Sequence, residues 1–396
     1  MEDLSCDVLV VGAGPAGSMT AKWAAKHGAN VVMLEKRQEI GSPVRCGEGI
    51  SKSWLTEVGI VPSHRWINVE VEGARIFSPS EKVMEINEKH AGNEVGYVVE
   101  RDAFDKALAI DAANAGTTIH LKTHATGILK EDGRVVGVRA KHFGEPFTIR
   151  AKVTVGADGF ESQMGRWAGL PTNLQLRDMD SCLQYRMTNV DCDPRYCDFY
   201  LGKVAPGGYV WIFPKGEGIA NVGIGVQVSQ VRNAAEVKSY LDRWIDKHPG
   251  YAKGKTIDMV GGGVSISQPV KQSVLPGFML VGDAARTIDP LTGGGIANGC
   301  IAGKIAGEVA ARASLQGDAS LEALLDYDRR WRKALEEKLL RNWIAKEKLV
   351  TLPDATFDKI IDALSGVKLE KLSVLNILKA VRDKYPEVTK EFEAFL

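Results

Sequence analysis

Three glycines near the start of the chain have the spacing of a dinucleotide-binding turn. Gly12, Gly14 and Gly17 follow an apolar run at residues 7–11, which is typical of a buried parallel strand. Gly12 allows a tight turn, Gly14 lets a diphosphate approach the backbone, and Gly17 lets the next helix pack on the strand. Glu35 ends the second apolar run, where a carboxylate accepts ribose hydroxyls and disfavours a 2′-phosphate. The pattern therefore indicates FAD or NAD rather than NADP.

A helix over residues 16–27 must complete this turn. It begins near Ala16 and directs its free backbone amides, and the positive end of its dipole, at the diphosphate. A lone GxGxxG in a chain with 42 glycines is also compatible with an ordinary turn. Here strand, glycines, helix, strand and acid occur in full order, which favours the cofactor interpretation.

Composition restricts the function classes. The 396 residues, 44% of them hydrophobic, suffice for two or three domains. Lys+Arg and Asp+Glu both number 50, so net charge gives no indication of a nucleic-acid partner. The six scattered cysteines favour reduced thiols in a cytoplasmic protein and predict no metal site, although pairing of Cys192 with Cys197 stays open. Neither a signal peptide nor a membrane-spanning helix is expected.

Periodicity predicts the remaining elements. In the first half, strands are expected over residues 67–77, 82–86, 95–99, 118–121, 125–130, 135–140 and 153–155, with a helix over 101–115. An antiparallel sheet is expected from residues 181–189, 197–201, 209–214 and 221–227, with a helix near 235–247. A helix rich in Gly and Ala follows over 296–312, and the chain is expected to be helical from residue 321 onward.

Two later motifs also end apolar runs in Gly and Asp, namely GADG at 156–159 and VGDAA at 281–285. Each alone is typical of an ordinary turn. In order with the opening fingerprint, the set resembles the FAD-dependent oxidoreductases typified by para-hydroxybenzoate hydroxylase, over residues 4–320. The resemblance places Asp158 in the cofactor site, and it implies that Asp283 binds the ribityl chain. It further implies that Arg101 contacts the cofactor and that the backbone near Ala125 lies by the adenine.

The loop at residues 289–295 opens the small-residue helix. Bare amides at Gly294, Gly295 and Ile296 suit an anion, and reduced flavin carries negative charge near N1 and O2. A glycine hinge that packs the helix closely is compatible with the same residues.

Two motifs indicate the substrate. Tyr209, Trp211 and Phe213 share one strand face because side chains alternate with a period of two. An aromatic strand face is usually core packing. Here Y-x-W-x-F-P and a following G-x-G resemble the substrate-domain signature of geranylgeranyl reductases. The RCGEG segment at 45–49 resembles the loop that these enzymes hold near the flavin, and it supplies Cys46, Gly47 and Gly49.

The resemblance implies an FAD-dependent reductase that saturates isolated C=C bonds of geranylgeranyl chains. The expected substrate is the digeranylgeranyl glycerol ether phospholipid of archaeal-type membranes. Reduced flavin supplies a hydride from N5, and an acid or water supplies a proton. Cys46 is the leading candidate for ring contact or proton control, with Glu48 and Tyr209 as weaker acids; a pocket-lining role for Cys46 is equally compatible. The electron donor stays open between NAD(P)H and a ferredoxin-like protein, since the sequence holds no second fingerprint.

The expected fold is mixed α/β, with a Rossmann-like FAD-binding domain at residues 1–65, 98–170 and 262–320. An antiparallel β-sheet substrate domain is expected at 66–97 and 171–261, and a C-terminal helical region at 321–396.

An apolar stripe runs along the first helix of that last region. It consists of Leu324, Tyr327, Trp331, Leu335, Leu339 and Trp343. Eight Lys or Arg against three Glu between residues 329 and 348 suit an anionic bilayer surface. A helix docked on the protein is the slightly favoured alternative. Because exposing a C20 chain to water costs more than about 10 kcal/mol, we expect a cytoplasmic protein peripheral to the inner face of the cell membrane.

Two other functions are compatible with the cofactor motifs. An aromatic-ring monooxygenase would use the same scaffold, but the YxWxFP signature argues against it. A non-catalytic isoprenoid-lipid carrier would use FAD only as structure.

Overall fold

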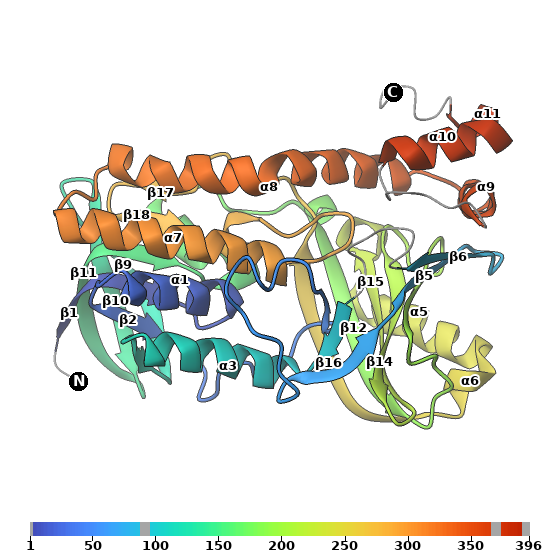
Figure 1. The fold of residues 1–396 in the computed structure, drawn as a ribbon, viewed down its shortest axis with the longest axis horizontal. Coiled ribbons are helices and arrows are strands. Elements are labelled where there is room, and N and C mark those ends of the chain that lie inside the picture. Colours follow the sequence, from blue (N-terminus) through green and yellow to red (C-terminus); the bar gives the residue numbers. More distant parts are fainter. Residues whose placement is uncertain (1–2, 88–95, 366–373, 390–396) are drawn as a thin grey trace.

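The computed structural model describes residues 3–87, 96–365 and 374–389, and places their strands in three sheets (Figure 1). The first sheet has the order β17-β18-β11-β1-β2-β8, and β10 and β9 extend it from β11. Its strands are β1 (Leu4–Val11), β2 (Val31–Leu34), β8 (Thr118–His120), β9 (Thr123–Glu131), β10 (Arg134–His142), β11 (Glu145–Gly156), β17 (Val274–Leu275) and β18 (Phe278–Leu280). The β11, β1, β2, β8 and β18 pairings are parallel. This sheet confirms the predicted Rossmann-like core.

Helices α1 (Pro15–Lys26) and α7 (Ile296–Gln316) cross closely beside this sheet. A Cβ at Gly303 would lie 2.5 Å from the carbonyl oxygen of Ala16, and one at Gly307 would lie 2.5 Å from that of Thr20. The Gly- and Ala-rich sequence of α7 is therefore required for this crossing. Helix α3 (Arg101–Asn114) packs on the other flank of α1, and the short α4 (Gln163–Ala168) lies near β9.

The second sheet has seven strands in the order β16-β12-β15-β14-β13-β5-β6. They are β5 (Gly73–Phe77), β6 (Val83–Asn87), β12 (Met179–Thr188), β13 (Tyr196–Tyr200), β14 (Tyr209–Gly216), β15 (Ile219–Gln227) and β16 (Lys255–Ser265). The predicted antiparallel sheet is confirmed, except that β13 and β5 pair in parallel. Helix α5 (Ala234–Lys247) packs on β12 and β15, and α6 (Pro249–Ala252) follows it.

The prediction of one strand over residues 67–77 is wrong. The segment forms β4 (Ile67–Val71) and β5, which lie in different sheets, because the chain crosses from one to the other at Glu72. Strand β4 joins β3 (Gly49–Ser51) and β7 (Gly96–Val99) in a three-stranded sheet. The first residue of the strand predicted over 95–99 lies outside the described residues. No strand was predicted for β16, and the strand predicted over 153–155 is only the end of the longer β11.

The C-terminal helices are α8 (Leu321–Leu349), α9 (Asp354–Leu364), α10 (Val374–Lys384) and α11 (Pro386–Thr389). Helix α8 runs from the parallel sheet to the seven-stranded sheet, and α9 lies beside β6 (Figure 1). The rest of the helical tail predicted to residue 396 lies outside the described residues.

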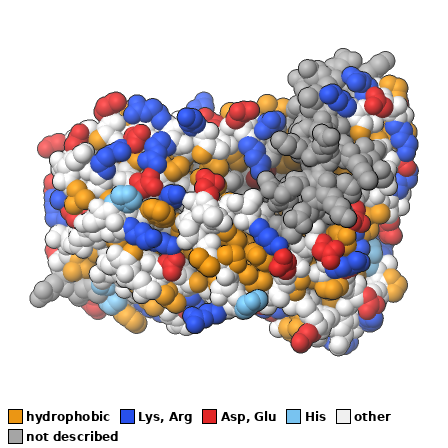
Figure 2. Space-filling view, viewed as in Figure 1, with side chains coloured by type: hydrophobic (Ala, Val, Ile, Leu, Met, Phe, Trp, Pro, Cys, Tyr) orange, Lys and Arg blue, Asp and Glu red, His pale blue; other side chains and the backbone are white. Residues whose placement is uncertain are grey.

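The apolar stripe of α8 is buried in the protein. Tyr327 and Trp331 are fully buried, the Tyr327 hydroxyl donates to the Leu280 carbonyl at 2.7 Å, and Trp331 Nε1 donates to Ser273 Oγ at 3.0 Å. Charged side chains of both signs lie along the edge that α8 forms (Figure 2). The hypothesis that this stripe contacts a membrane is therefore wrong, and the docked-helix alternative is correct. None of the helices in the described part of the chain combines the length and apolarity of a bilayer span.

Candidate active site

One cavity of about 1650 Å³ extends from the C-terminal end of β1 to the seven-stranded sheet. This exceeds the roughly 300–1000 Å³ of a pocket for one small ligand, so a cofactor and a substrate fit together. Every site residue predicted from the sequence lines this cavity except Gly17. A Cβ at Gly17 would lie 1.9 Å from the Gly12 carbonyl oxygen, so Gly17 serves the close packing of α1.

The dinucleotide end has the space that a diphosphate needs. Gly12 has a φ of +110°, and its Cβ would lie 2.3 Å from the Ala157 carbonyl oxygen. Gly14 caps α1, and a Cβ there would meet no protein atom within 4 Å, because this position faces the cavity. No side chain caps α1, so its first amides stay free for an anion. These residues fit the diphosphate of FAD.

Two carboxylates flank this end. Glu35 Oε2 accepts from the Ala13 amide at 3.2 Å and Oε1 from the Arg37 amide at 2.9 Å, which orients the carboxylate at the cavity wall. Asp158 Oδ2 accepts from the Met164 amide at 2.9 Å, while its buried Oδ1 has no partner among the described residues. Burial raises the pKa of Asp158. An orphaned buried oxygen beside the cavity fits a hydroxyl or phosphate partner.

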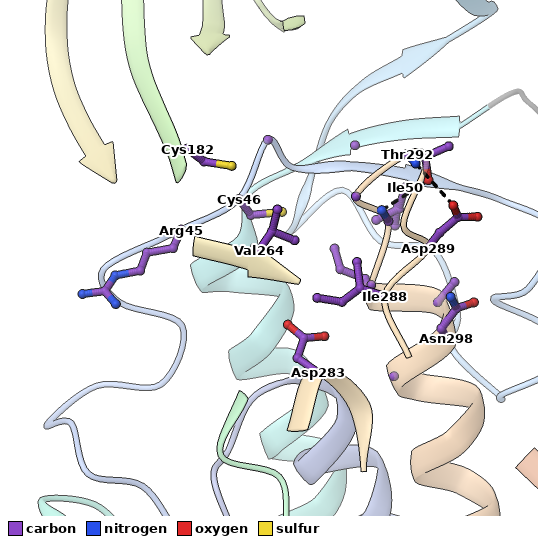
Figure 3. Close-up of a pocket in the computed structure, with 18 of the residues that line it drawn as sticks. Arg45, Cys46, Ile50, Cys182, Val264, Asp283, Ile288, Asp289, Thr292 and Asn298 are labelled. Carbon is purple, nitrogen blue, oxygen red and sulfur yellow. Dashed lines mark hydrogen bonds between the residues drawn. The ribbon is translucent and has the colours of Figure 1, made fainter. Parts of the chain in front are cut away.

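Asp283 faces the middle of the cavity from the turn after β18, together with Ile288 and Cys46 (Figure 3). Burial raises the pKa of Asp283, although Arg101 and Arg286 act against the shift. Among the described residues, no group donates a hydrogen bond to this carboxylate. Its oxygens are therefore available to ribityl hydroxyls, the role that the family resemblance implies for this residue.

Three side chains hold the glycine loop before α7. Asp289 Oδ1 accepts from the amides of Leu291 and Thr292, at 3.0 and 3.3 Å. Asp289 Oδ2 accepts from Asn342 Nδ2 of α8 at 2.7 Å, and the Tyr209 hydroxyl of β14 donates to the Thr292 carbonyl. The loop leads into α7 at Ile296 without a side-chain cap. The free amides suit the anionic edge of a flavin.

The loop that carries Cys46 rests on the aromatic face of β14. Gln184 Nε2 donates to the Cys46 carbonyl at 3.0 Å, and Trp211 Nε1 donates to Gln184 Oε1 at 2.8 Å. A Cβ at Gly47 would lie 2.7 Å from the Phe213 ring, so glycine allows the loop to touch that ring. The loop and the substrate face therefore form one surface.

Cys46 itself is half-buried and lines the cavity. Its sulfur accepts from the Glu48 amide at 3.2 Å. Despite burial, Asp105 and Cys46 raise the pKa of Arg101, whose guanidinium also binds Asp105 through two 2.9 Å bonds. The thiol thus faces the cavity beside the Arg101 guanidinium.

Glu48 lies beneath the loop and is fully buried. Its oxygens accept from the Arg101 amide at 2.8 Å, Arg186 Nη2 at 2.8 Å, Lys215 Nζ at 2.9 Å and Asn221 Nδ2 at 2.6 Å. Four donors, two of them cationic, already occupy its two oxygens. Glu48 is therefore an anchor for the loop and is unsuited to the proton-donor role considered from sequence.

Tyr209 is more compatible with proton transfer by position. Burial, with Cys182 and Asp180 nearby, raises the pKa of Tyr209, so the phenol stays protonated. Sequence reasoning missed Asp180, which is buried on β12, separated from β14 by β15, and whose pKa burial raises to about 7. It also missed the anchors Gln184, Lys215 and Asn221, because isolated polar residues in strands carry no spacing signal.

The far end of the cavity is apolar. Its walls come from β5, β6 and α9, with Ile76, Met84, Ile86, Phe357, Ile361 and Leu364. The sequence assigned no function to the residues that form α9. All six cysteines are free thiols, so Cys192 and Cys197 do not pair. The described residues contain no cluster of three or more potential metal ligands.

Comparisons with known proteins decide the family. Residues 178–264 match the geranylgeranyl reductase catalytic domain, and residues 7–64 match an FAD-binding domain. The digeranylgeranylglycerophospholipid reductase of Picrophilus torridus is 52% identical over 396 residues, which is 100% of both chains. The chain belongs to the digeranylgeranylglycerophospholipid reductase family. The Methanosarcina acetivorans member is 46% identical over 95% of this chain and 92% of its own. Family membership makes the protein an FAD-dependent oxidoreductase.

Solved structures agree with this family. A geranylgeranyl bacteriochlorophyll reductase-like protein from Thermoplasma acidophilum is 52% identical, with a TM-score of 0.95 and 100% of both chains covered. A flavin-dependent brominase is 19% identical, with a TM-score of 0.72 over 98% of this chain and 100% of its own. The brominase shares the fold alone.

Proposed function

We propose that this protein uses FAD to saturate the isolated C=C bonds of geranylgeranyl chains, most specifically those of digeranylgeranylglycerophospholipid. The observation that carries the proposal is a single cavity with a dinucleotide turn at one end and aromatic and aliphatic walls at the other. Reduced FAD supplies hydride chemistry when bound. Family membership supports the same activity.

In this proposal the chain's residues bind, orient and exclude water. Gly12, Gly14 and Ala16 hold the diphosphate, Glu35 the ribose, and Asp283 the ribityl chain. The cofactor wall is completed by Gly47, Gly49, Arg101, Ala125, Asp158, Gly294, Gly295 and Ile296. Tyr209, Trp211 and Phe213 would position the alkene from the cavity wall that they line. Because an isolated alkene offers no carbonyl to polarise, positioning supplies much of the catalysis.

Cys46 is the proposed residue for contact with the ring or control of the proton. Its sulfur lies at the junction of the polar and apolar parts of the cavity, beside the Arg101 guanidinium. Tyr209 is the proposed second proton source. Its hydroxyl is held by the Thr292 carbonyl in the same loop that presents the free amides.

The electron donor and the membrane contact are further proposals. We infer that NAD(P)H or a ferredoxin-like protein binds transiently to reduce the flavin. We also propose a cytoplasmic protein that meets the inner face of the membrane peripherally, through the cavity opening and not through the stripe of α8. The domain boundaries at residues 66, 98, 171, 262 and 321 stay a prediction.

An anaerobic single-turnover experiment tests the activity. The purified protein is reduced with dithionite, excess reductant is removed, and digeranylgeranyl lipid is added. Reoxidation of the flavin with a lipid mass gain of 2 per double bond is expected. Reoxidation only by oxygen with a phenol would support a monooxygenase, and tight lipid binding with no mass change would support a carrier.

A further inference from the structure

A row of paired residues crosses the seven-stranded sheet on the face that lines the cavity. Trp211 of β14 pairs with Phe199 of β13, Phe199 pairs with Ile76 of β5, and Ile76 pairs with Met84 of β6. All four line the cavity. Because residues directly opposite each other place their side chains on the same face, they form one continuous floor from the Cys46 loop to β6.

The length of this floor follows from the sheet spacing. Three inter-strand steps separate Trp211 from Met84, which is roughly 14 Å at about 4.8 Å per step. Three isoprene units contain twelve main-chain bonds, which extend roughly 15 Å because bonds of about 1.5 Å zigzag. The floor therefore matches the part of a geranylgeranyl chain that lies beyond its first double bond.

The described residues of β6 and α9 form a wall at the far end. β6 is the last strand of its sheet, and α9 packs against it. Met84, Ile86, Ile361 and Leu364 form one buried cluster there, each at most 5% exposed. Substrate atoms that pass Met84 must displace this packing.

The cavity-lining face of α8 orients the lipid. Lys338 and Arg341 line the cavity and are exposed, and the Lys338 side chain is 68% exposed. Ala345 and Leu349 continue the same helix face toward α9 and are apolar. Lys338 and Arg341 therefore suit a phosphate head group in the register that brings the bond nearest the head group to the cofactor, with the prenyl tail directed toward the wall.

We propose that the span from Trp211 to the β6–α9 wall limits how much prenyl chain lies beyond the reacting bond, and so decides which double bonds are reduced. This inference rests on the proposed function. In each reduction one π bond is replaced by two C–H bonds: the reduced cofactor gives one hydride, which carries both electrons and leaves the cofactor oxidised, and a protein acid or water gives one proton. Reaction at the bond nearest the head group requires three further units within the span, whereas the terminal bond requires none.

Wild-type protein gives the first test. It is reduced with dithionite under anaerobic conditions and offered glycerol phosphate lipids with chains of four or five isoprene units. We expect all double bonds of the four-unit chain to be reduced, whereas the bond nearest the head group of the five-unit chain reacts at least tenfold more slowly than its other bonds. Product positions are read by tandem mass spectrometry. Equal reduction of all five bonds, or sparing of the terminal bond, would overturn the inference.

Filling the wall gives the second test. Ile86→Phe and Ile361→Phe come from different elements and should each make the four-unit chain behave like the five-unit one. Val83→Phe is the matched control, since Val83 is 39% exposed on the opposite face of β6, and its products should equal those of wild type. Variants that reduce all four bonds like wild type would contradict the proposal.

Binding separates this inference from the proposed function. Fully saturated lipids with four or five units are titrated into FAD-loaded wild-type protein, and the change in flavin fluorescence is followed. We expect at least tenfold tighter binding of the four-unit lipid, because only this lipid fits the register in which its head group meets Lys338 and Arg341, whereas the five-unit lipid must bind without that contact. Equal affinities would overturn the inference even where the unsaturated lipids react. If the affinities differ as expected but no double bond is reduced, the proposed function is rejected and the inference about chain length stands.

Discussion

Replacing Glu48 by glutamine removes one charge from the network beneath the Cys46 loop. In wild type, two carboxylates, Glu48 and Glu100, face two cations, Arg186 and Lys215, and the charges balance. Although burial opposes it, Glu48 and Glu100 raise the pKa of Arg186. Glu48→Gln keeps the shape of the side chain but leaves two cations against one carboxylate.

The expected loss is large because both ends of the central pair are buried. The side chains of Glu48 and Lys215 are 0% and 2% exposed. Removing one partner of such a pair costs about 3–5 kcal/mol, since the other charge stays buried without compensation. At about 2.1 cal/mol/K per residue, 396 residues give an unfolding entropy of about 0.8 kcal/mol/K. Glu48→Gln should therefore lower Tm by about 4–6 °C.

Differential scanning calorimetry with saturating FAD measures this shift. Glu131→Gln is the control, because Glu131 pairs with Arg150 on the surface with more than half of each side chain exposed, and its Tm should change by less than about 1 °C. Adding Lys215→Met to Glu48→Gln removes the excess cation and should restore more than half of the loss. A Glu48→Gln Tm within 1 °C of wild type, or additive losses in the double variant, would refute the reasoning.

Three further predictions concern the cavity and its surroundings. Burial raises the pKa of Asp180 to about 7, so between about pH 4 and pH 7 the folded protein keeps a proton that the unfolded chain has released. The free energy of unfolding is therefore highest below about pH 4, where both states are protonated at Asp180, and it falls as the pH rises to about 7. Asp180→Asn should therefore match wild type in Tm near pH 4 and exceed it at pH 8, and a constant difference from pH 4 to 8 would contradict this. Gly14→Val should weaken FAD binding at least tenfold in a fluorescence titration with an unchanged Tm of the FAD-free protein, whereas Gly17→Ala should lower that Tm, because only its Cβ meets backbone. Cys46→Ala should keep its FAD absorbance and lose at least tenfold in double-bond turnover; unchanged turnover and products would show that Cys46 has no chemical role.

The cofactor end of the site was predictable because neighbouring residues in the sequence determine its backbone turns and the positions of its carboxylates. The turn at Gly12 and Gly14, and the carboxylates at Glu35, Asp158 and Asp283, come within a few residues of the end of a strand. Each requirement is set by the backbone conformation or by the end of a strand, and sequence spacing reports both. The structure brings these segments to one cavity, as their resemblance implied.

The substrate end was predictable only in part. Alternation placed Tyr209, Trp211 and Phe213 on one face, but nothing local indicated that Ile76 and Met84 continue that face across two more strands. Their positions depend on pairing between segments more than a hundred residues apart. The same holds for α9, whose apolar residues were compatible with any docked helix. The break at Glu72 was missed because polar and apolar residues alternate along residues 67–77. Gly73, beside the break, is the only glycine or proline in that segment, and a single glycine does not rule out a continuous strand.

The anchoring role of Glu48 also lay beyond sequence reasoning. Its four donors come from α3, β12, β14 and β15. A carboxylate beside a reactive cysteine is a reasonable acid until its partners are known. Only the tertiary structure shows that the charge is already neutralised.

The contact between the Cys46 loop and Phe213 constrains how this protein can change. Cβ atoms at Gly47 and Gly49 would lie 2.7 and 3.0 Å from the Phe213 ring. A side chain at Gly47 is therefore excluded while the phenyl ring keeps its place, and one at Gly49 requires the ring to shift; both contacts are relieved once that ring is reduced to a smaller residue. Substitutions at these positions should show strong order dependence, with Phe213→Ala permitting Gly47→Ala but not the reverse. A lineage or a designer that reshapes the substrate wall must alter the wall first and the loop second.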